Sequence, residues 1–130
     1  MAHYVDTSAL AKLVVAEPET ERLRAWLRDN DDDLVSSDLT RTELIRAVRR
    51  VDPSLAVRAR EVLDTVYLTE VTSAIFTEAG RLDPTALRSL DAIHVAAALD
   101  LGDDIDTFVT YDERLAMAAR VNALATIAPS

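Results

Sequence analysis

Apolar and polar residues recur along this chain with two periods, which predict alternating strands and helices. Short apolar runs predict strands at residues 2–5, 34–36, 67–71, 107–110 and 123–127. Apolar residues spaced three or four positions apart predict helices. The predicted helices run from residue 7 to about 17, through 23–27 (ending in a turn at 30–33), from about 40 to 51, and over 53–66, 73–82, 89–101 and 112–120. A short helical piece is predicted after 83–84. This alternation favours a single three-layer α/β/α domain over residues 1–130, with a short, mostly parallel twisted sheet of about five strands.

The predicted helix 89–101 is the most apolar element of the chain. From Ala92 to Leu99 every side chain except His94 is apolar, so we expect this helix to be buried on most sides. Gly102 follows as a natural left-handed cap. Asp91 lies at the head of the helix, where a carboxylate is costly unless hydrogen bonds, an opposite charge or a metal meet it. Asp91 is therefore the first candidate functional residue.

Composition excludes several classes of protein. Apolar residues make up 49% of the chain, yet no apolar run approaches the roughly 20 residues of a membrane span. The N-terminus shows no charged region followed by a cleavable apolar stretch. The absence of cysteine removes disulfides, thiol catalysis and thiolate metal sites. We expect a cytoplasmic protein with no membrane association.

The net charge of −9 argues against a protein that coats nucleic acid through a broad basic surface. It does not exclude a nucleic-acid enzyme, because carboxylates that hold cations also make a protein acidic. Of the 14 basic residues only Lys12 is lysine. Arginine suits bidentate contacts to phosphate, although genome composition could produce the same bias.

Four acids fall at equivalent places in this pattern. Asp6 and Asp112 each end a predicted strand and open a helix, while Glu43 and Asp91 lie in the first turns of theirs. In a parallel sheet these positions share one edge, where ligands bind. Four such acids would repel one another unless a cation intervened. Pooled carboxylates are hard ligands, suited to Mg²⁺ or Mn²⁺ rather than to zinc.

Each acid also has a purely structural interpretation. Thr40 and Glu43 fit a capping box, in which Glu43 reaches back to the Thr40 N–H. Asp6 and Asp112 could cap the helices that they precede. Asp91 could simply favour the positive end of its helix dipole. Each of these structural roles accounts for one acid by itself. Together they do not account for the predicted position of all four acids at one edge of the sheet.

Residues near the acids carry two interpretations as well. His94 follows Asp91 by one turn and could ligate a metal with it, or could be a satisfied core histidine. Arg46 and Arg50 follow Glu43 at i+3 and i+7 on the same face. They could line a path for a phosphate backbone, or merely solvate the helix and pair with acids.

Hydroxyl side chains accompany the first and last predicted acids. Ser8 and Thr110 could orient water or backbone beside a metal, although helix capping explains Ser8 equally well. His3, near the start of the first strand, has no partner that the sequence identifies.

Four segments of the chain resemble the PIN-domain family, specifically the VapC ribonuclease toxins of bacterial toxin–antitoxin pairs. They are YVDTSAL at 4–10, TELIRA at 42–47, LDAIHVAAA at 90–98 and VTYDERL at 109–115. Any one of them is a weak signal. The ordered set covers essentially the whole chain at the family's usual spacing, which makes the resemblance strong.

The resemblance implies a Mg²⁺- or Mn²⁺-dependent endoribonuclease that hydrolyses phosphodiester bonds in tRNA or rRNA. Carried over by position, its metal site and catalytic residues are Asp6, Glu43, Asp91 and Asp112, whereas the residue at His94 is not a ligand. The family varies in a further acid, for which Glu113 is the candidate here, so one or two ions remain open. The implied partners are a VapB-type antitoxin, which blocks the site with a C-terminal segment, and a second copy in a homodimer.

Two rival functions are compatible with parts of the pattern. Phosphoryl transfer through an aspartyl-phosphate at Asp6 would need a second Asp where the chain has Ser8, and a late lysine where the chain has only Lys12. A catalytically inactive PIN-like binding module is the non-enzymatic alternative. Loss of any of the four acids would favour that module, and all four are present.

Overall fold

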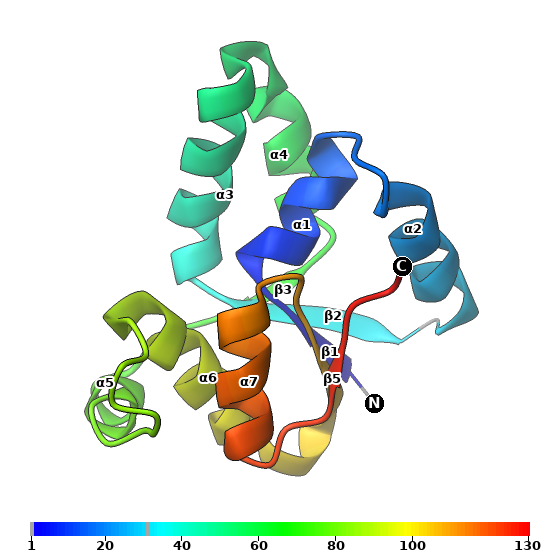
Figure 1. Cartoon of the computed structure of the whole chain (residues 1–130). Coiled ribbons are helices and arrows are strands. Elements are labelled where there is room, and N and C mark those ends of the chain that lie inside the picture. Colours follow the sequence, from blue (N-terminus) through cyan, green and yellow to red (C-terminus); the bar gives the residue numbers. More distant parts are fainter. Residues whose placement is uncertain (1, 31) are drawn as a thin grey trace.

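A computed structural model describes residues 2–30 and 32–130, and these form a five-stranded sheet between two layers of helices (Figure 1). The strands are β1 (Ala2–Val5), β2 (Asp33–Ser37), β3 (Tyr67–Thr69), β4 (Ile105–Val109) and β5 (Thr126–Ile127). Their order is β3-β2-β1-β4-β5, and every neighbouring pair is parallel. The predicted three-layer α/β architecture is confirmed.

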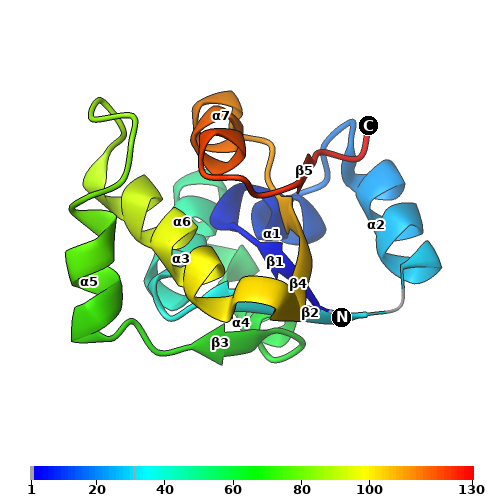
Figure 2. The same ribbon diagram turned by 90° about the horizontal axis from the view of Figure 1, so that it is seen from below.

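The helices divide between the two faces of the sheet. They are α1 (Thr7–Val14), α2 (Thr20–Asp29), α3 (Leu39–Val51), α4 (Ala56–Leu63), α5 (Ser73–Ala79), α6 (Ser89–Leu101) and α7 (Glu113–Val121), with short 3₁₀ helices η1 (Pro53–Leu55) and η2 (Gly102–Asp104). One hydrophobic cluster joins α1–α4 to the sheet and a second joins α5–α7 to its other face. Figure 2 views the molecule from the α5–α7 side.

The two central strands supply side chains to both clusters. Tyr4 of β1 stacks on Phe108 of β4 in the α5–α7 layer, with ring centroids 5.1 Å apart. Their neighbours Val5 and Val109 face the α1–α4 layer. Because successive side chains point to opposite faces, a strand covered on both sides reads as a continuous apolar run. The residues that directly follow these two strands are therefore attached to a part of the sheet that is packed on both faces.

Helix α6 matches its predicted bounds, and every residue from Ala92 to Ala98 is buried. The run of alanines leaves short side chains, so the helix contacts the sheet and both α5 and α7. Gly102 ends it with a φ of 55°, in the region that favours glycine, as predicted.

Several of the predicted elements differ from the structure. The helix expected over 53–66 is divided into η1 and α4. The strands expected at 67–71 and 123–127 are shorter, and the helix expected over 73–82 ends at Ala79. The short helical piece predicted after 83–84 is wrong: these residues form a turn closed by a bond from Leu87 N to Pro84 O (3.0 Å). Asp83 precedes a proline, which disfavours the helical conformation there.

The predicted turn at 30–33 includes Asp31, which lies outside the described residues. Among the helices formed by the remaining residues, none combines the length and apolar content needed to cross a membrane.

Candidate metal centre at the carboxyl edge of the sheet

Asp6 directly follows β1 and is the N-cap of α1. Its Oδ1 accepts hydrogen bonds from the Ala9 N–H (3.1 Å) and the Ser8 hydroxyl (2.7 Å), and its Oδ2 accepts one from the Thr110 hydroxyl (2.8 Å). The side chain is buried, with the residue 3% exposed. Burial raises the pKa of Asp6, and these hydrogen bonds offset only part of the effect.

Ser8 and Thr110 join Asp6 to the loop that follows β4. The Ser8 hydroxyl accepts a bond from the Tyr111 N–H (2.9 Å), and the Thr110 hydroxyl accepts one from the Asp112 N–H (3.1 Å). Each hydroxyl therefore donates to Asp6 and accepts from this loop. The structure brings both predicted auxiliary residues to the first acid.

Asp112 is the N-cap of α7, as one of its two interpretations predicted. Its Oδ1 accepts from the Arg114 N–H (3.0 Å) and the Leu115 N–H (3.2 Å). No described residue donates to its Oδ2. Capping and metal binding are thus compatible, because they use different oxygens of one carboxylate.

Glu43 lies in α3, but the capping-box interpretation is wrong. The helix begins at Leu39 with Asp38 as its N-cap, so Thr40 lies inside the helix, and its hydroxyl contacts that of Ser36 (2.7 Å). Its Oε1 accepts from the Thr7 hydroxyl (3.0 Å) and lies 2.5 Å from His94 Nε2. Burial alone would raise the pKa of Glu43, but the His94 and Thr7 contacts outweigh it and hold that pKa below its usual value.

His94 is a buried link between the sheet and Glu43. Its Nδ1 lies 2.8 Å from the Tyr4 hydroxyl, and the residue is 2% exposed. Burial raises the pKa of Tyr4, so its phenol keeps the proton. In the neutral ring, Nε2–H donates to Glu43 and Nδ1 accepts from Tyr4. Both nitrogens are engaged by protein, which favours the satisfied-core interpretation over metal ligation.

Asp91 lies in the first turn of α6, with a side chain only 19% exposed. Burial raises its pKa, and the charge of Asp112 raises it further. The nearest cation is Arg88, whose Nε lies 3.8 Å from Asp91 Oδ2, and no described residue donates a hydrogen bond to this carboxylate. Asp91 therefore faces another acid and solvent.

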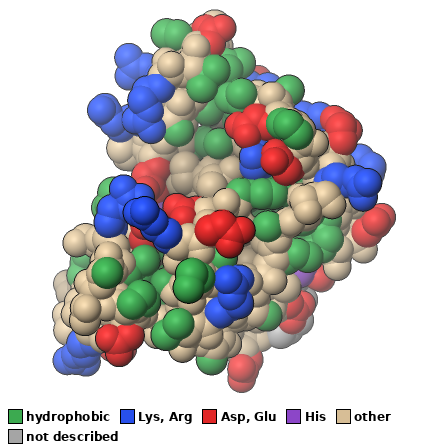
Figure 3. Space-filling view, in the orientation of Figure 1, with side chains coloured by type: hydrophobic (Ala, Val, Ile, Leu, Met, Phe, Trp, Pro, Cys, Tyr) green, Lys and Arg blue, Asp and Glu red, His purple; other side chains and the backbone are tan. Residues whose placement is uncertain are grey.

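Asp6, Glu43, Asp91 and Asp112 are called here the carboxyl-edge acids. Figure 3 shows acidic side chains in the recess between α3 and the α6–α7 side of the molecule, with basic side chains over α3. Glu43 and Asp112 each accept hydrogen bonds at one oxygen only, Asp6 accepts at both oxygens, and Asp91 accepts none from a described residue. Because each carboxylate oxygen has two lone pairs, all four keep acceptor capacity. This all-oxygen donor set fits Mg²⁺ or Mn²⁺.

Arg46 and Arg50 lie further along α3 and line a surface pocket together with Arg49 and Pro53. None of these three arginines forms an ion pair with a described residue. Pairing with acids, one of their structural interpretations, is therefore not seen, and a role toward phosphate stays a prediction.

A second group of potential ligands lies at the opposite edge of the sheet and was not predicted. His3, Asp32 and Asp106, called here the amino-edge group, each bring one ligand atom within 4.8 Å of the others. His3 Nδ1 lies 2.7 Å from the Thr107 hydroxyl and Nε2 lies 3.2 Å from Asp32 Oδ2. Ala2 pairs with Ile105 but His3 pairs with Thr107, so Asp106 is an extra residue. Sequence periodicity carries no signal for such a bulge.

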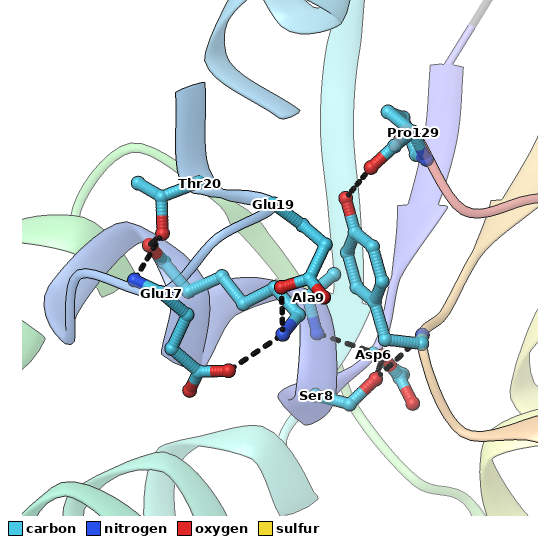
Figure 4. A network of polar contacts seen from close by, with 9 residues as sticks. Asp6, Ser8, Ala9, Glu17, Glu19, Thr20 and Pro129 are labelled. Carbon is cyan, nitrogen blue, oxygen red and sulfur yellow. Dashed lines mark hydrogen bonds and ion pairs between the residues drawn. The ribbon is translucent and has the colours of Figure 1, made fainter. Parts of the chain in front are cut away.

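Sequence reasoning also missed the support beneath the Asp112 loop (Figure 4). Lys12 Nζ contacts Glu17 (2.7 Å) and Glu19 (3.0 Å) and lies 4.7 Å from the centre of the Tyr111 ring. The Tyr111 hydroxyl donates to the Pro129 carbonyl (2.6 Å). Tyr111 precedes Asp112 and is fixed at its backbone by Ser8, so ring and backbone contacts together hold this loop.

Fold and site define a small three-layer α/β protein with an acidic centre at the carboxyl edge of a parallel sheet. The model of the PIN domain family matches residues 3–121, so the chain belongs to the PIN domain family. It is 42% identical to "Ribonuclease VapC47" of Mycobacterium tuberculosis, over 97% of this chain and 96% of that protein.

Solved structures show the same fold. The crystal structure of Mycobacterium tuberculosis VapC20, described as a sarcin-ricin loop cleaving toxin, matches with a TM-score of 0.79 at 18% identity, over 98% of this chain and 99% of that one. VapBC2 from Rickettsia felis, bound to a DNA fragment from its promoter, matches with a TM-score of 0.72 at 13% identity, over the full length of both chains.

Proposed function

We propose that this protein is a metal-dependent endoribonuclease that hydrolyses phosphodiester bonds in RNA, with tRNA or rRNA as substrate. The observation that carries the proposal is the set of carboxyl-edge acids, which come from four separate segments and keep acceptor capacity for a cation. A full-length relative named as a ribonuclease supports the RNA substrate.

In this proposal Asp6 and Asp91 are the principal metal ligands, with Glu43 and Asp112 as further ligands. A bound Mg²⁺ or Mn²⁺ would supply Lewis-acid charge for the phosphate and lower the pKa of a water. Magnesium commonly keeps several of its waters and uses one or two carboxylates plus substrate phosphates. That preference agrees with acids spread along an edge, and either one or two ions would be accommodated.

The neighbouring residues hold these carboxylates in place. Ser8 and Thr110 fix both oxygens of Asp6, and His94 fixes Glu43 from the buried side. Preorganised carboxylates need no rearrangement when the ion binds. Arg46 and Arg50 would contact the phosphate backbone of the RNA beyond Glu43, as guanidinium groups do in RNA complexes.

We also propose that the chain acts as a single PIN domain in the cytoplasm, as the toxin of a toxin–antitoxin pair. The VapBC2 neighbour supports a VapB-type antitoxin as partner. We include a homodimer in this proposal, with the exposed apolar side chains of Val51 on α3 and Val57 on α4 as candidates for its interface. An antitoxin segment that covers the carboxyl-edge acids would block cleavage.

The alternative is a catalytically inactive PIN-like module that only binds a partner. Incubation of the purified protein with total tRNA and rRNA, with and without Mn²⁺, and mapping of the cut ends separates the two. We expect discrete metal-dependent cuts that EDTA abolishes. Activity that EDTA leaves unchanged would contradict the proposal, and no cleavage under any metal condition would favour the binding module.

A further inference from the structure

A second recess lies directly beside the carboxyl-edge acids. It has a volume of about 190 Å³ and opens between the turn at residues 84–88 and helix α7. Its apolar wall includes Pro84, Leu87 and Met117, and its charged residues are Arg88, Asp91 and Arg114. We call this recess the Met117 pocket. Because Asp91 belongs to both, the pocket and the acidic centre are continuous.

The apolar wall of the Met117 pocket is not required by the packing of α7. That helix packs through Leu115, Ala116, Ala118 and Ala119, which are buried, whereas Met117 is 61% exposed. An exposed apolar side chain alone is ordinary. Here Met117 faces further apolar residues across a recess that ends at a charged site, which is typical of a ligand pocket.

The charges around this wall indicate the chemistry of the ligand. Arg88 is 74% exposed and only loosely paired with Asp91, and Arg114 forms no ion pair with a described residue. Two available guanidinium groups beside an apolar wall suit a flat, weakly polar group attached to an anion. A nucleotide has this combination, and unstacked bases in RNA complexes lie against apolar side chains and Arg planes.

We propose that the Met117 pocket binds one unstacked nucleobase of the RNA strand, next to the phosphodiester bond that is cleaved, with Arg88 and Arg114 contacting the flanking phosphates. This inference rests on the proposed ribonuclease function. A phosphate held at the carboxyl-edge acids is covalently joined to bases one nucleotide away, and Asp91 lies between the two sites. The pocket would therefore contribute preference for the base beside the cut.

The test measures binding rather than cleavage, in an Asp6→Asn background that keeps the RNA intact. Fluorescence anisotropy compares an oligoadenylate octamer with an abasic ribose-phosphate octamer that carries the same number of phosphates. We expect the base-bearing octamer to bind about tenfold more tightly, within the range that one base stack contributes. Met117→Glu and Met117→Ala should each remove most of this difference.

Val121→Glu is the matched control, because it adds the same charge to the same helix at an exposed position that does not line the pocket. It should weaken both octamers by similar factors and keep the difference between them. If Met117→Glu behaves as Val121→Glu does, the inference is overturned. It is also overturned if Met117→Glu keeps the base preference and instead weakens binding of an inhibitory VapB-type antitoxin, which would make the pocket a peptide site.

Failure of the proposed function has a different outcome. In that case the unmodified protein cleaves neither tRNA nor rRNA with any metal, whatever the octamers show. Failure of the present inference leaves cleavage intact and shows no dependence of the base preference on Met117.

Discussion

At its amino end strand β1 carries His3, and directly beyond its carboxyl end lies Asp6. The amino-edge group around His3 places an imidazole against two carboxylates, so the group contains its own potential hydrogen-bond donor. The carboxyl-edge acids comprise four carboxylates, and their one neighbouring imidazole, His94, is already shared between Glu43 and Tyr4. The first group can be satisfied within the protein, whereas the second has acceptors left over for an external cation.

The comparison also shows that compactness alone does not identify a functional site. The amino-edge group is the tighter of the two, with its ligand atoms all within 4.8 Å. The carboxyl-edge acids are not gathered so tightly: Asp6 and Asp112 lie where strands end and helices begin, Asp91 lies in the first turn of α6, and Glu43 lies just beyond the first turn of α3. For an ion that retains water, the wider arrangement is the better fit.

Removing one carboxyl-edge acid should have the largest effect. We expect Asp6→Asn or Asp91→Asn to lower metal-dependent RNA cleavage by more than about 100-fold, because loss even of an outer partner of a ligand costs about 10- to 100-fold. Asp106→Asn, the matched change in the amino-edge group, should leave the rate of tRNA cleavage unchanged. Loss of activity in Asp106→Asn with retention in Asp6→Asn would reverse the comparison.

Metal binding should stabilise the fold through the same acids. A ligand present at 100 times its Kd stabilises the native state by about 2.7 kcal/mol, so saturating Mg²⁺ should raise the Tm and EDTA should reverse the change. Calorimetry of Asp91→Asn should show this rise lost, and Asp106→Asn should show it preserved. A rise that survives in Asp91→Asn but not in Asp106→Asn would locate the ion at the amino edge.

The two buried histidines offer a finer comparison, because each has a hydroxyl partner. Tyr4→Phe leaves the fully buried His94 Nδ1 unpaired and should cost about 1–3 kcal/mol of unfolding free energy. Thr107→Val removes the partner of His3 at a half-buried position, where water can replace it, and should cost about 0.5–1.5 kcal/mol. Urea unfolding measures both. A larger cost for Thr107→Val would show that the amino edge is the drier environment.

The smallest effect is expected for Asp32→Asn. The Asp32 side chain, which pairs with His3, is 38% exposed. Ion pairs with an exposed partner contribute about 0–1 kcal/mol to the free energy of unfolding. Urea unfolding at low and high salt should therefore differ little from that of the unmodified protein. A loss above that range would mean that the amino-edge group is a structural centre.

Much of the edge carrying the carboxyl-edge acids could be predicted from sequence, because local pattern determines it. Asp6 and Asp112 stand where apolar runs give way to helical spacing, and that transition is visible in the residues themselves. Parallel topology then brings strand ends together. Their roles as ligands stay predictions that the variants above test.

Contacts between distant residues could not be predicted in the same way. Tyr4 and His94 are 90 positions apart, and only the packing of α6 against the sheet makes them neighbours. Asp106 faces His3 because of a one-residue bulge, which leaves no trace in the alternation of β4. Lys12 looked like a solitary lysine, because its glutamates and Tyr111 meet it only once the chain has turned after α1.

The pairing of β1 with β4 has a consequence for the synthesis of this protein. Asp6 leaves the ribosome well before its hydroxyl partner Thr110, which lies 104 positions later in the chain. Translation proceeds at about 5–20 residues per second, so several seconds pass between the synthesis of Asp6 and that of Thr110. A nascent or prematurely terminated chain lacks part of the acidic edge. For the proposed ribonuclease, we therefore expect a nascent chain that still lacks Thr110 and Asp112 to be inactive.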